Sequence, residues 1–352
     1  MKYLRLILFP FAILYGLIGA VRNLFYQIGI FKSTSFEMPI ICVGNLSTGG
    51  TGKTPHIEYL IRMLSNNYNT ATLSRGYKRK TEGFIIANKN HTAADIGDEP
   101  LQFFKKFPNI HVTVDRKRAN GVAQIKQNTN TELVLLDDAF QHRAIKAGFY
   151  ILLSDYNHLF TSDFILPAGN LRESRFGANR ADLVIVTKCP NHIDLQQKEK
   201  IKKRIAQYTK ADVCFSSIHY TNPISLSSKE SIALNKDTHY LLVSGIANPK
   251  PLYNYLNKKS ISYTKITFPD HHHFDEQDIH KIMLAFDKID SKNKQILTTE
   301  KDAMRLYDHS NTWIESNPIS YIPIQICMNE KDEETFRSKI HTFIKQKTKY
   351  KV

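Results

Sequence analysis

A glycine-rich segment at residues 44–55 constrains the fold of this chain more than any other feature. It reads Gly-Asn-Leu-Ser-Thr-Gly-Gly-Thr-Gly-Lys-Thr-Pro and follows the apolar, strand-like run 39–43. After it, four apolar side chains recur at the spacing of one buried helix face: Ile57, Leu60, Ile61 and Leu64. A strand, a glycine-rich turn and a helix in this order predict a phosphate-binding P-loop.

Each part of such a loop has a chemical role. Its glycines let successive backbone N–H groups turn toward a phosphate, here those of Gly49, Gly50, Thr51 and Gly52. Lys53 would reach the β- and γ-phosphates, and the Thr54 hydroxyl would ligate Mg²⁺. The usual pattern has glycine where this chain has Ser47, so the match is a variant. The alternative is a glycine-rich turn followed by an incidental Lys-Thr pair.

Two pairs of carboxylates accompany the loop. Asp137 and Asp138 follow the apolar run 133–136, which is how a Walker B strand supplies oxygen ligands for Mg²⁺ or its water. Asp98 and Glu99 stand just before a predicted helix. Both pairs have a plain alternative, a turn for the first and a turn with a helix N-cap for the second.

A histidine run at 271–273 follows Asp270 and offers imidazole for proton handling. Metal binding and simple surface exposure are the alternatives. Adjacent side chains on a strand point in different directions, so three histidines in a row make a poor single metal site.

Composition places the chain among ordinary globular proteins with an anionic partner. Its 48 basic and 33 acidic residues give a net charge of +15. That excess favours a nucleotide, nucleic acid, phosphorylated substrate or acidic membrane without choosing among them. The four cysteines lack zinc-site spacing, and we expect buried free thiols: Cys42, Cys189, Cys214 and Cys327.

The N-terminal segment is apolar. Residues 6–21 carry no charge, and a helix of that length reaches roughly 24 Å, which is short of a hydrocarbon core of roughly 30 Å. An apolar face continues through Phe31, so we expect a helix that lies in or dips into the membrane interface. A cleaved signal peptide with residues 1–5 as its basic start, or a plain core helix, are the alternatives.

Downstream, strand-like and helical patterns alternate along the chain. This order predicts an α/β fold, with a P-loop NTPase-like, mainly parallel sheet sandwiched by helices and a second, smaller α/β domain. We expect a membrane-associating segment at 1–35, a P-loop domain at 36–220 and the smaller domain at 221–352. The smaller domain would contribute the Asp-His-His motif.

Taken together, these motifs resemble the tetraacyldisaccharide 4′-kinase family, the lipid A 4′-kinases. The resemblance runs through most of the chain, and the Ser47 variant of the loop fits it. Its motifs are Val43–Pro55, Ser74–Tyr77, Gly97–Pro100, Asp137–Arg143, Leu166–Gly169, Leu171–Glu173, Arg180–Asp182, Asp270–His272 and Thr298–Ala303. Ala139 stands where the family pattern has glycine.

The resemblance implies transfer of the ATP γ-phosphoryl group to the 4′-hydroxyl of a tetraacyldisaccharide 1-phosphate at the cytoplasmic face of the inner membrane. Mg²⁺ would be held through Thr54 and Asp138 with help from Glu99. Asp98 would accept the hydroxyl proton, and His271 would orient or tune the Asp98 carboxylate. Contacts to the lipid substrate or metal would come from Arg75, Arg116, Arg118, His142, Arg172 and Glu173.

Two other classes of function fit parts of the sequence. One is a membrane-targeted nucleotide-hydrolysing switch, for which Thr187-Lys188 after an apolar strand is a partial guanine-recognition motif that lacks its aspartate. The other is a nucleic-acid-binding ATPase, which only the positive charge suggests. Phosphate transfer to a lipid acceptor separates the kinase from both.

Overall fold

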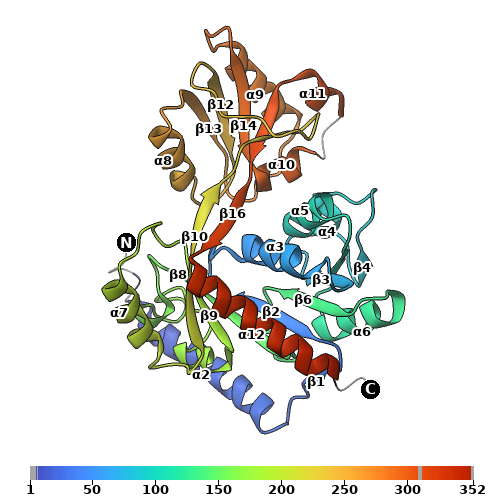
Figure 1. Ribbon diagram of the computed structural model, residues 1–352, viewed down its shortest axis with the longest axis vertical. Coiled ribbons are helices and arrows are strands. Elements are labelled where there is room, and N and C mark those ends of the chain that lie inside the picture. Colours follow the sequence, from blue (N-terminus) through green and yellow to red (C-terminus); the bar gives the residue numbers. More distant parts are fainter. Residues whose placement is uncertain (1–4, 6, 308–310, 350–352) are drawn as a thin grey trace.

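The computed structural model describes residues 5, 7–307 and 311–349 of the chain. Figure 1 shows two α/β units, a larger one at the bottom and a smaller one at the top, joined by two neighbouring strands. The predicted fold class, a mainly parallel sheet covered by helices with a second α/β unit, is confirmed.

Within the described residues, nine strands form the sheet of the larger unit in the order β16-β10-β9-β8-β2-β6-β3-β5-β4. All neighbours are parallel except the two edge pairs, β16 with β10 and β4 with β5. Their bounds are β2 (Ile40–Asn45), β3 (Thr70–Ser74), β4 (Ile85–Ile86), β5 (His111–Val114), β6 (Leu133–Asp137), β8 (Phe149–Asp155), β9 (Leu183–Thr187), β10 (Asp212–Tyr220) and β16 (Ile324–Met328).

The central strands read as continuous apolar runs because helices cover both faces of this sheet. Side chains alternate between two cores: Ile41 and Val43 pack with α3, whereas Ile40 and Cys42 pack with α6. The helices are α3 (Lys53–Leu64), α4 (Ala93–Ile96), α5 (Asp98–Lys106), α6 (Arg118–Asn128), α7 (Leu195–Ile205) and α12 (Glu330–Lys349), with 3₁₀ turns η1 (Phe160–Ser162) and η2 (Arg175–Arg180). Two short strands, β1 (Thr34–Ser35) and β7 (Ile145–Lys146), pair separately.

The smaller unit is built on a sheet with the order β11-β15-β14-β12-β13, in which β11 alone is antiparallel to its neighbour among the described strands. Its strands are β11 (Ile224–Ser225), β12 (His239–Ser244), β13 (Tyr263–Thr267), β14 (Lys294–Thr299) and β15 (Ile319–Ile322). Its helices are α8 (Lys250–Lys258), α9 (Glu276–Asp287), α10 (Glu300–Leu306) and α11 (Asn311–Ser316).

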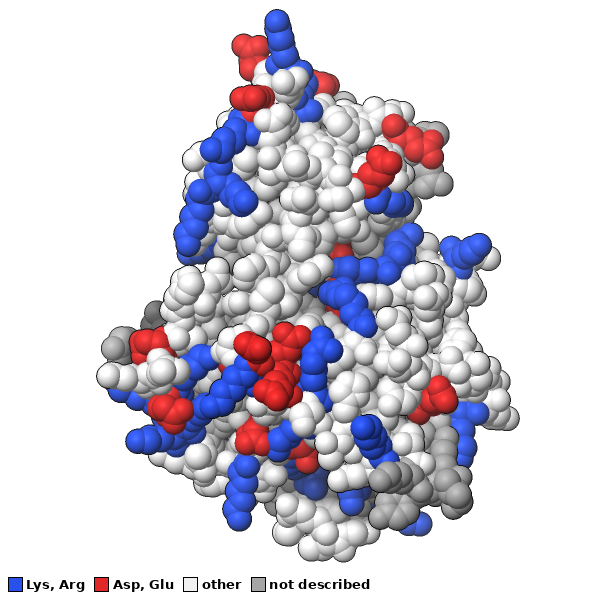
Figure 2. Space-filling model, in the orientation of Figure 1, with Lys and Arg blue, Asp and Glu red and all other residues white. Residues whose placement is uncertain are grey.

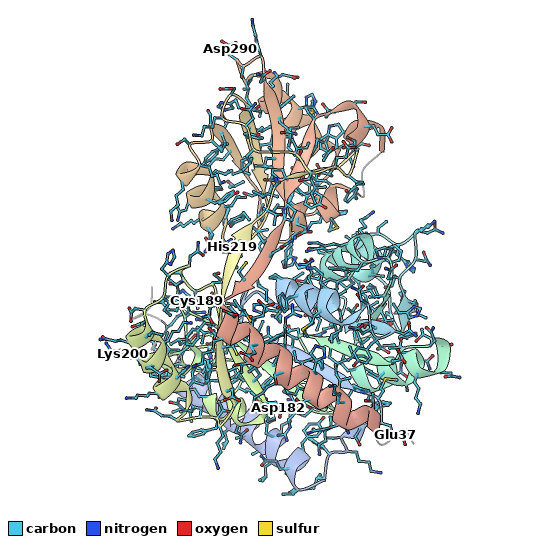
Figure 3. All side chains as sticks on the ribbon, viewed as in Figure 1. Glu37, Asp182, Cys189, Lys200, His219 and Asp290 are labelled. Atoms are coloured by element: carbon cyan, nitrogen blue, oxygen red, sulfur yellow. The ribbon has the colours of Figure 1, made fainter. Side chains whose placement is uncertain are left out.

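The last elements of the chain, β16 and α12, pack against the larger unit although they lie within the range 221–352. Pro323 interrupts the apolar run 321–326, because proline offers no N–H to a strand ladder. The chain then returns as β16, which pairs antiparallel with β10, and α12 buries Phe336 and Ile340 in the core of the larger unit. His219, labelled in Figure 3, lies on this connection. The division near residue 220 stays a prediction.

Helix α3 is buried on more than the one face expected from its apolar spacing. His56 and Glu58 are 2% and 0% exposed. His56 Nδ1 lies 2.7 Å from the Gly52 carbonyl and therefore carries the proton, while Nε2 accepts from the Ser216 hydroxyl of β10 at 3.0 Å. Lys106 of α5 bridges Glu58 and Glu300 of α10 at 2.7 and 2.6 Å. Neighbouring elements thus provide hydrogen-bond and ion-pair partners for the buried polar side chains of α3.

Helix α2 (Phe9–Gln27) lies along the larger unit with most of its apolar side chains exposed. Of its residues only Ala12 is buried, so the core-helix alternative is wrong. Its 19 residues reach about 28 Å, longer than expected, and among the described helices it is the one apolar and long enough to cross a membrane. Residues 1–4 of the signal-peptide alternative lie outside the described part of the chain.

Cys327 is exposed, although the sequence predicted a buried thiol.

The buried His56 predicts a loss of stability in mild acid. Burial lowers the pKa of His56 to about 4, whereas the unfolded chain takes up this proton near pH 6.5. The unfolded state therefore binds more protons between these values, and the free energy of unfolding falls as the pH drops. From pH 7 to 5 this one group should cost about 2 kcal/mol. Urea unfolding of the protein and of His56→Gln measures it; equal pH dependence in both would contradict it.

Candidate active site

The glycine-rich loop joins β2 to α3 at the carboxyl edge of the larger sheet. Gly49 and Gly52 have φ of 104° and 87°, a region that side chains with a β-carbon rarely adopt. Gly52 caps α3, whose first turn contains Lys53 and the buried Thr54. The Lys53 ammonium lies 3.4 Å from Asn45 Oδ1 and 3.6 Å from Asp138 Oδ1. The N-terminus of α3, its dipole and this cation together suit an anion.

Strand β6 delivers the Asp137-Asp138 pair beside the loop, because β2 and β6 are parallel neighbours and end at the same edge. Asp138 pairs with Lys53 and also with Arg172, whose Nη1 is 3.0 Å away. Burial raises the pKa of Asp138, but the two cations outweigh burial and the net shift is downward.

Asp137 differs from its neighbour. The Ser74 hydroxyl donates to its Oδ2 at 3.2 Å, whereas its Oδ1 is buried and has no hydrogen-bond partner in the described part of the chain. Burial, followed by the charges of Glu99 and Asp138, raises the pKa of Asp137 to about 7. The carboxyl group of Asp137 is therefore more readily protonated than those of Asp138 and Glu99, whose pKa values are lowered.

Helix α5 brings a second pair of carboxylates to the same edge. Gly97, with a φ of 97°, turns the chain into the helix and leaves Asp98 and Glu99 in its first turn. The turn-and-cap alternative therefore applies to Gly97, and the functional role of the two acids stays a prediction. Glu99 pairs with Lys301 of α10 at 2.7 Å, and the charge of Lys301 is the main reason that the pKa of Glu99 is lowered.

Asp98 contacts two residues of the smaller unit. His271 Nδ1 lies 3.0 Å from Asp98 Oδ2, and Arg305 Nη2 lies 2.8 Å from the same oxygen. Burial favours the neutral acid, but the hydrogen bond from His271 and the charge of Arg305 outweigh it, so the pKa of Asp98 is below its usual value. The predicted Asp98–His271 pair is thus formed between groups 173 positions apart.

Of the three adjacent histidines, only His271 contacts Asp98 in the described structure. His272 Nε2 pairs with Asp278 Oδ2 at 2.6 Å and stacks on Phe268. His273 is exposed. The geometry therefore separates the three side chains, which lie in the turn and loop after β13 and not on a strand.

The donor set near the loop fits a hard divalent cation. Among the described residues no three His, Cys, Asp or Glu side chains form a ready metal cluster. The orphaned Asp137 Oδ1 and the mutual repulsion of Asp137, Asp138 and Glu99 are what a bound cation would relieve. Carboxylate and hydroxyl oxygens are the ligands that Mg²⁺ prefers.

Three of the predicted substrate contacts lie near the ends of β3, β5 and β6. Arg75 is exposed, and Arg116 is exposed beside Glu82 at 3.6 Å. His142 is half-buried, and burial together with the charges of Arg118, Arg22 and Arg75 lowers its pKa to about 4. A cluster of guanidinium groups of this kind suits a phosphate.

The other three predicted contacts have protein partners. Arg118 is 2% exposed and donates to the carbonyls of Asp115 and Asp137 at 2.7 and 3.2 Å, so it supports the strand ends, and its role as a substrate contact stays a prediction. Arg172 pairs with Asp138. Glu173 is buried and accepts from Arg180 at 2.7 Å and from Gln141 at 3.1 Å.

Several charged groups of this edge had no predicted role. Lys106, Lys301 and Arg305 make the contacts between α5 and α10, and Figure 2 shows Lys and Arg side chains gathered where the two units meet. The Thr298–Ala303 motif pointed to this segment, but nothing in the sequence pairs its residues with Asp98 or Glu99.

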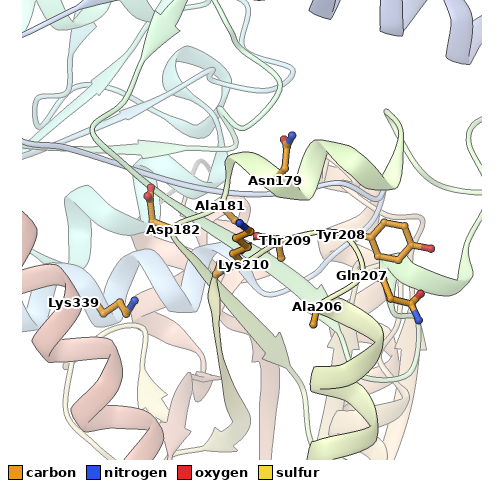
Figure 4. Close-up of a pocket in the computed structure, with 10 residues that line it drawn as sticks. Asn179, Ala181, Asp182, Ala206, Gln207, Tyr208, Thr209, Lys210 and Lys339 are labelled. Carbon is orange, nitrogen blue, oxygen red and sulfur yellow. Dashed lines mark hydrogen bonds between the residues drawn. The ribbon is translucent and has the colours of Figure 1, made fainter.

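A hollow of about 540 Å³, drawn in Figure 4, lies away from this edge. Asp182 and Ala211, which line it, stand just before β9 and β10. Parallel strands begin at the edge opposite to the one where they end, so this hollow is separate from the P-loop.

Comparison with known proteins agrees with this arrangement. The family model described as Tetraacyldisaccharide-1-P 4'-kinase matches residues 4–345. Proteins named Tetraacyldisaccharide 4'-kinase are 50% identical in Flavobacterium johnsoniae, over 92% of this chain and 93% of that protein, and 50% identical in Flavobacterium psychrophilum, over 99% of both. A crystal structure of LpxK from Aquifex aeolicus in complex with ATP has a TM-score of 0.77 and 27% identity, covering 97% of this chain and 99% of that one. This chain therefore belongs to the tetraacyldisaccharide 4′-kinase family.

Proposed function

We propose that this protein transfers the γ-phosphoryl group of ATP to the 4′-hydroxyl of a tetraacyldisaccharide 1-phosphate in lipid A biosynthesis. The names of its relatives and the ATP of the similar crystal structure support the activity and the co-substrate. The observation that carries the proposal is the meeting of a P-loop with the Asp98–His271 pair at one edge. A nucleotide switch needs no group to accept a proton from an alcohol.

Phosphoryl transfer depends mainly on positioning and charge neutralisation. The loop amides of residues 49–52 and the Lys53 ammonium would hold the phosphates. Thr54, Asp138 and Glu99 would hold Mg²⁺, with the free Asp137 Oδ1 as a further oxygen nearby. Mg²⁺, when bound, would neutralise charge on the phosphates. Lys53 and Arg172 would then exchange part of their contact with Asp138 for the nucleotide.

The acceptor hydroxyl must lose its proton to a group beside it. Asp98 can accept that proton, with His271 orienting the carboxylate. The contact between Asp98 and Arg305 favours a second version, because it lowers the pKa of Asp98 and makes this carboxylate a weaker base. In that version Asp98 orients His271, and the imidazole Nε2 takes the proton. Both versions require the same pair.

The lipid substrate places the enzyme at a membrane. Helix α2 exposes residues such as Ile13 and Leu17, at 61% and 59%, which an aqueous surface disfavours. The net charge of +15 suits an anionic surface. We therefore propose peripheral or monotopic association with the cytoplasmic face of the inner membrane, where ATP is available.

The first test is transfer of label from γ-labelled ATP to the disaccharide 1-phosphate, followed by chromatography of the lipid. Lys53→Ala should lower this transfer by roughly 10²- to 10³-fold or more, because it removes a cation meant for the transferring phosphates. Lys200→Ala, at an exposed position of helix α7 (Figure 3), is the control. Near-normal turnover in a folded Lys53→Ala protein would refute the P-loop assignment.

The second test concerns the N-terminal helix. Deletion of residues 1–31 should move the protein from the membrane to the soluble fraction and weaken use of the lipid more than ATP binding. The point variants Ile13→Glu and Leu17→Glu should act in the same direction without removing the helix. Leu284→Glu, at a 49% exposed position of α9, is the matched control. A truncated chain that still sediments with membranes would place the anchor elsewhere.

The third test addresses the pair between the two units. Asp98→Ala and His271→Ala should each lower kcat by roughly 10²- to 10⁴-fold, with little change in ATP affinity. Because the two groups act as one unit, the double variant should be little worse than the worse single variant. His272→Ala is the control, since that ring pairs with Asp278. Multiplicative losses, or a larger loss at His272, would overturn the assignment.

A further inference from the structure

The contact that Arg305 makes with Asp98 crosses from the smaller unit to the larger one. Arg305 lies on α10, and its side chain is 3% exposed. Its Nε and Nη2 lie 2.9 and 2.8 Å from Asp98 Oδ2, the oxygen that His271 also contacts. A guanidinium that offers two N–H groups to one oxygen fixes the direction as well as the distance of the carboxylate.

The direction of the guanidinium is fixed by a second contact, which Arg305 makes within its own helix. Arg305 Nη1 lies 2.9 Å from Asp302 Oδ1, one turn earlier on the same helix. Asp302 is 0% exposed, and its Oδ2 accepts from the Thr299 hydroxyl at 2.6 Å and from the Gly245 N–H at 3.0 Å. These contacts leave Arg305 little freedom to turn away from Asp98.

The contacts among Thr299, Asp302 and Arg305 form a frame around the guanidinium. Gly245, which follows β12, connects this frame to His271. Its carbonyl accepts from Arg305 Nη1 at 3.2 Å and from the His271 N–H at 3.2 Å. The His271 backbone has a φ of 57°, which is costly for a residue with a side chain and persists only where its surroundings hold it. A β-carbon on Gly245 would lie 3.0 Å from Asp302 Oδ1 and 3.2 Å from the Pro269 carbonyl.

One frame therefore holds both members of the proposed catalytic pair. We propose that Arg305, fixed by Asp302 and Gly245, is a positioning residue for phosphoryl transfer that aims Asp98 and His271 at the acceptor hydroxyl. This inference rests on the proposed function of the Asp98–His271 pair. Asp98 Oδ1 takes no part in these contacts, so the frame holds one oxygen and leaves the other for the site.

A purely structural Arg305 and a positioning Arg305 predict different results. Loss of a structural contact lowers stability and leaves the folded enzyme with normal turnover. Loss of a positioning contact lowers kcat while KM for ATP changes little, because the phosphates bind at the loop on the other unit. Arg305→Gln, Arg305→Lys and Arg305→Ala separate the two, with Arg337→Gln on the exposed part of α12 as the control for a lost guanidinium.

Arg305→Gln should lower kcat by about 10²-fold, as misplacement of a catalytic group does. Arg305→Lys keeps the charge that the buried Asp302 needs but lacks the planar fork, so it should fold and still lose turnover. Millimolar guanidinium should restore part of the kcat of Arg305→Ala and none of that of Asp98→Ala. Normal kcat in a folded Arg305→Lys protein, or a loss confined to KM for ATP, would overturn the proposal.

A double-mutant cycle of Asp98 and Arg305 separates this proposal from the function on which it rests. In an Asp98→Ala background, Arg305→Gln should cost little further kcat, because the carboxylate that it aims is gone. Multiplicative losses there would overturn the positioning role while leaving Asp98 essential. Normal turnover in Asp98→Ala alone would instead refute the proposed pair itself, whatever Arg305 does.

Discussion

The ion pairs between α5 and α10 hold the two units in the arrangement on which the site depends. Asp98 contacts Arg305, Glu99 contacts Lys301, and Lys106 contacts Glu300. Acids at the start of α5 and a base at its end suit the helix dipole, and their partners on α10 have the opposite charges. Of the three pairs, Arg305–Asp98 has the most buried cation, and removing one partner of a buried pair leaves an uncompensated charge, which typically costs about 3–5 kcal/mol.

The larger unit alone would present the glycine-rich loop without both members of the proposed acid–base pair. The carboxyl ends of parallel strands meet at one edge, so β2, β6 and β3 bring the loop, the two aspartates and Arg75 together. His271 and Arg305 come from the other unit, through the connection of β10 and β16. In the proposed mechanism, proton transfer at the acceptor therefore depends on the relative position of the two units, whereas phosphate binding depends on the larger unit alone.

Charge at this edge is partly balanced by protein cations. Lys53 and Arg172 stand against Asp138, and Lys301 stands against Glu99, while Asp137 is buried with a raised pKa. Lys106 balances Glu58 and Glu300, and burial together with Glu58 raises the pKa of Glu300 to about 7. A divalent cation offsets part of the negative charge that a nucleotide brings, so the two together change the net charge of the site less than the nucleotide alone would.

The sequence by itself determined the parts of the site whose residues are close together in the chain. The loop, its lysine, the strand ending at Asp137 and the exposed apolar N-terminal helix all follow from local spacing, because backbone turns and amphipathic faces are local properties. The family could also be identified from the sequence, because its motifs occur in the same order along the chain. The tertiary structure alone decided that Arg118 is buried under the strand ends, that α12 returns to the larger unit, and that Arg305 meets Asp98. Those outcomes depend on contacts between residues far apart in the chain, which are apolar for α12 and polar for Arg118 and Arg305. Residue spacing carries no record of such pairing.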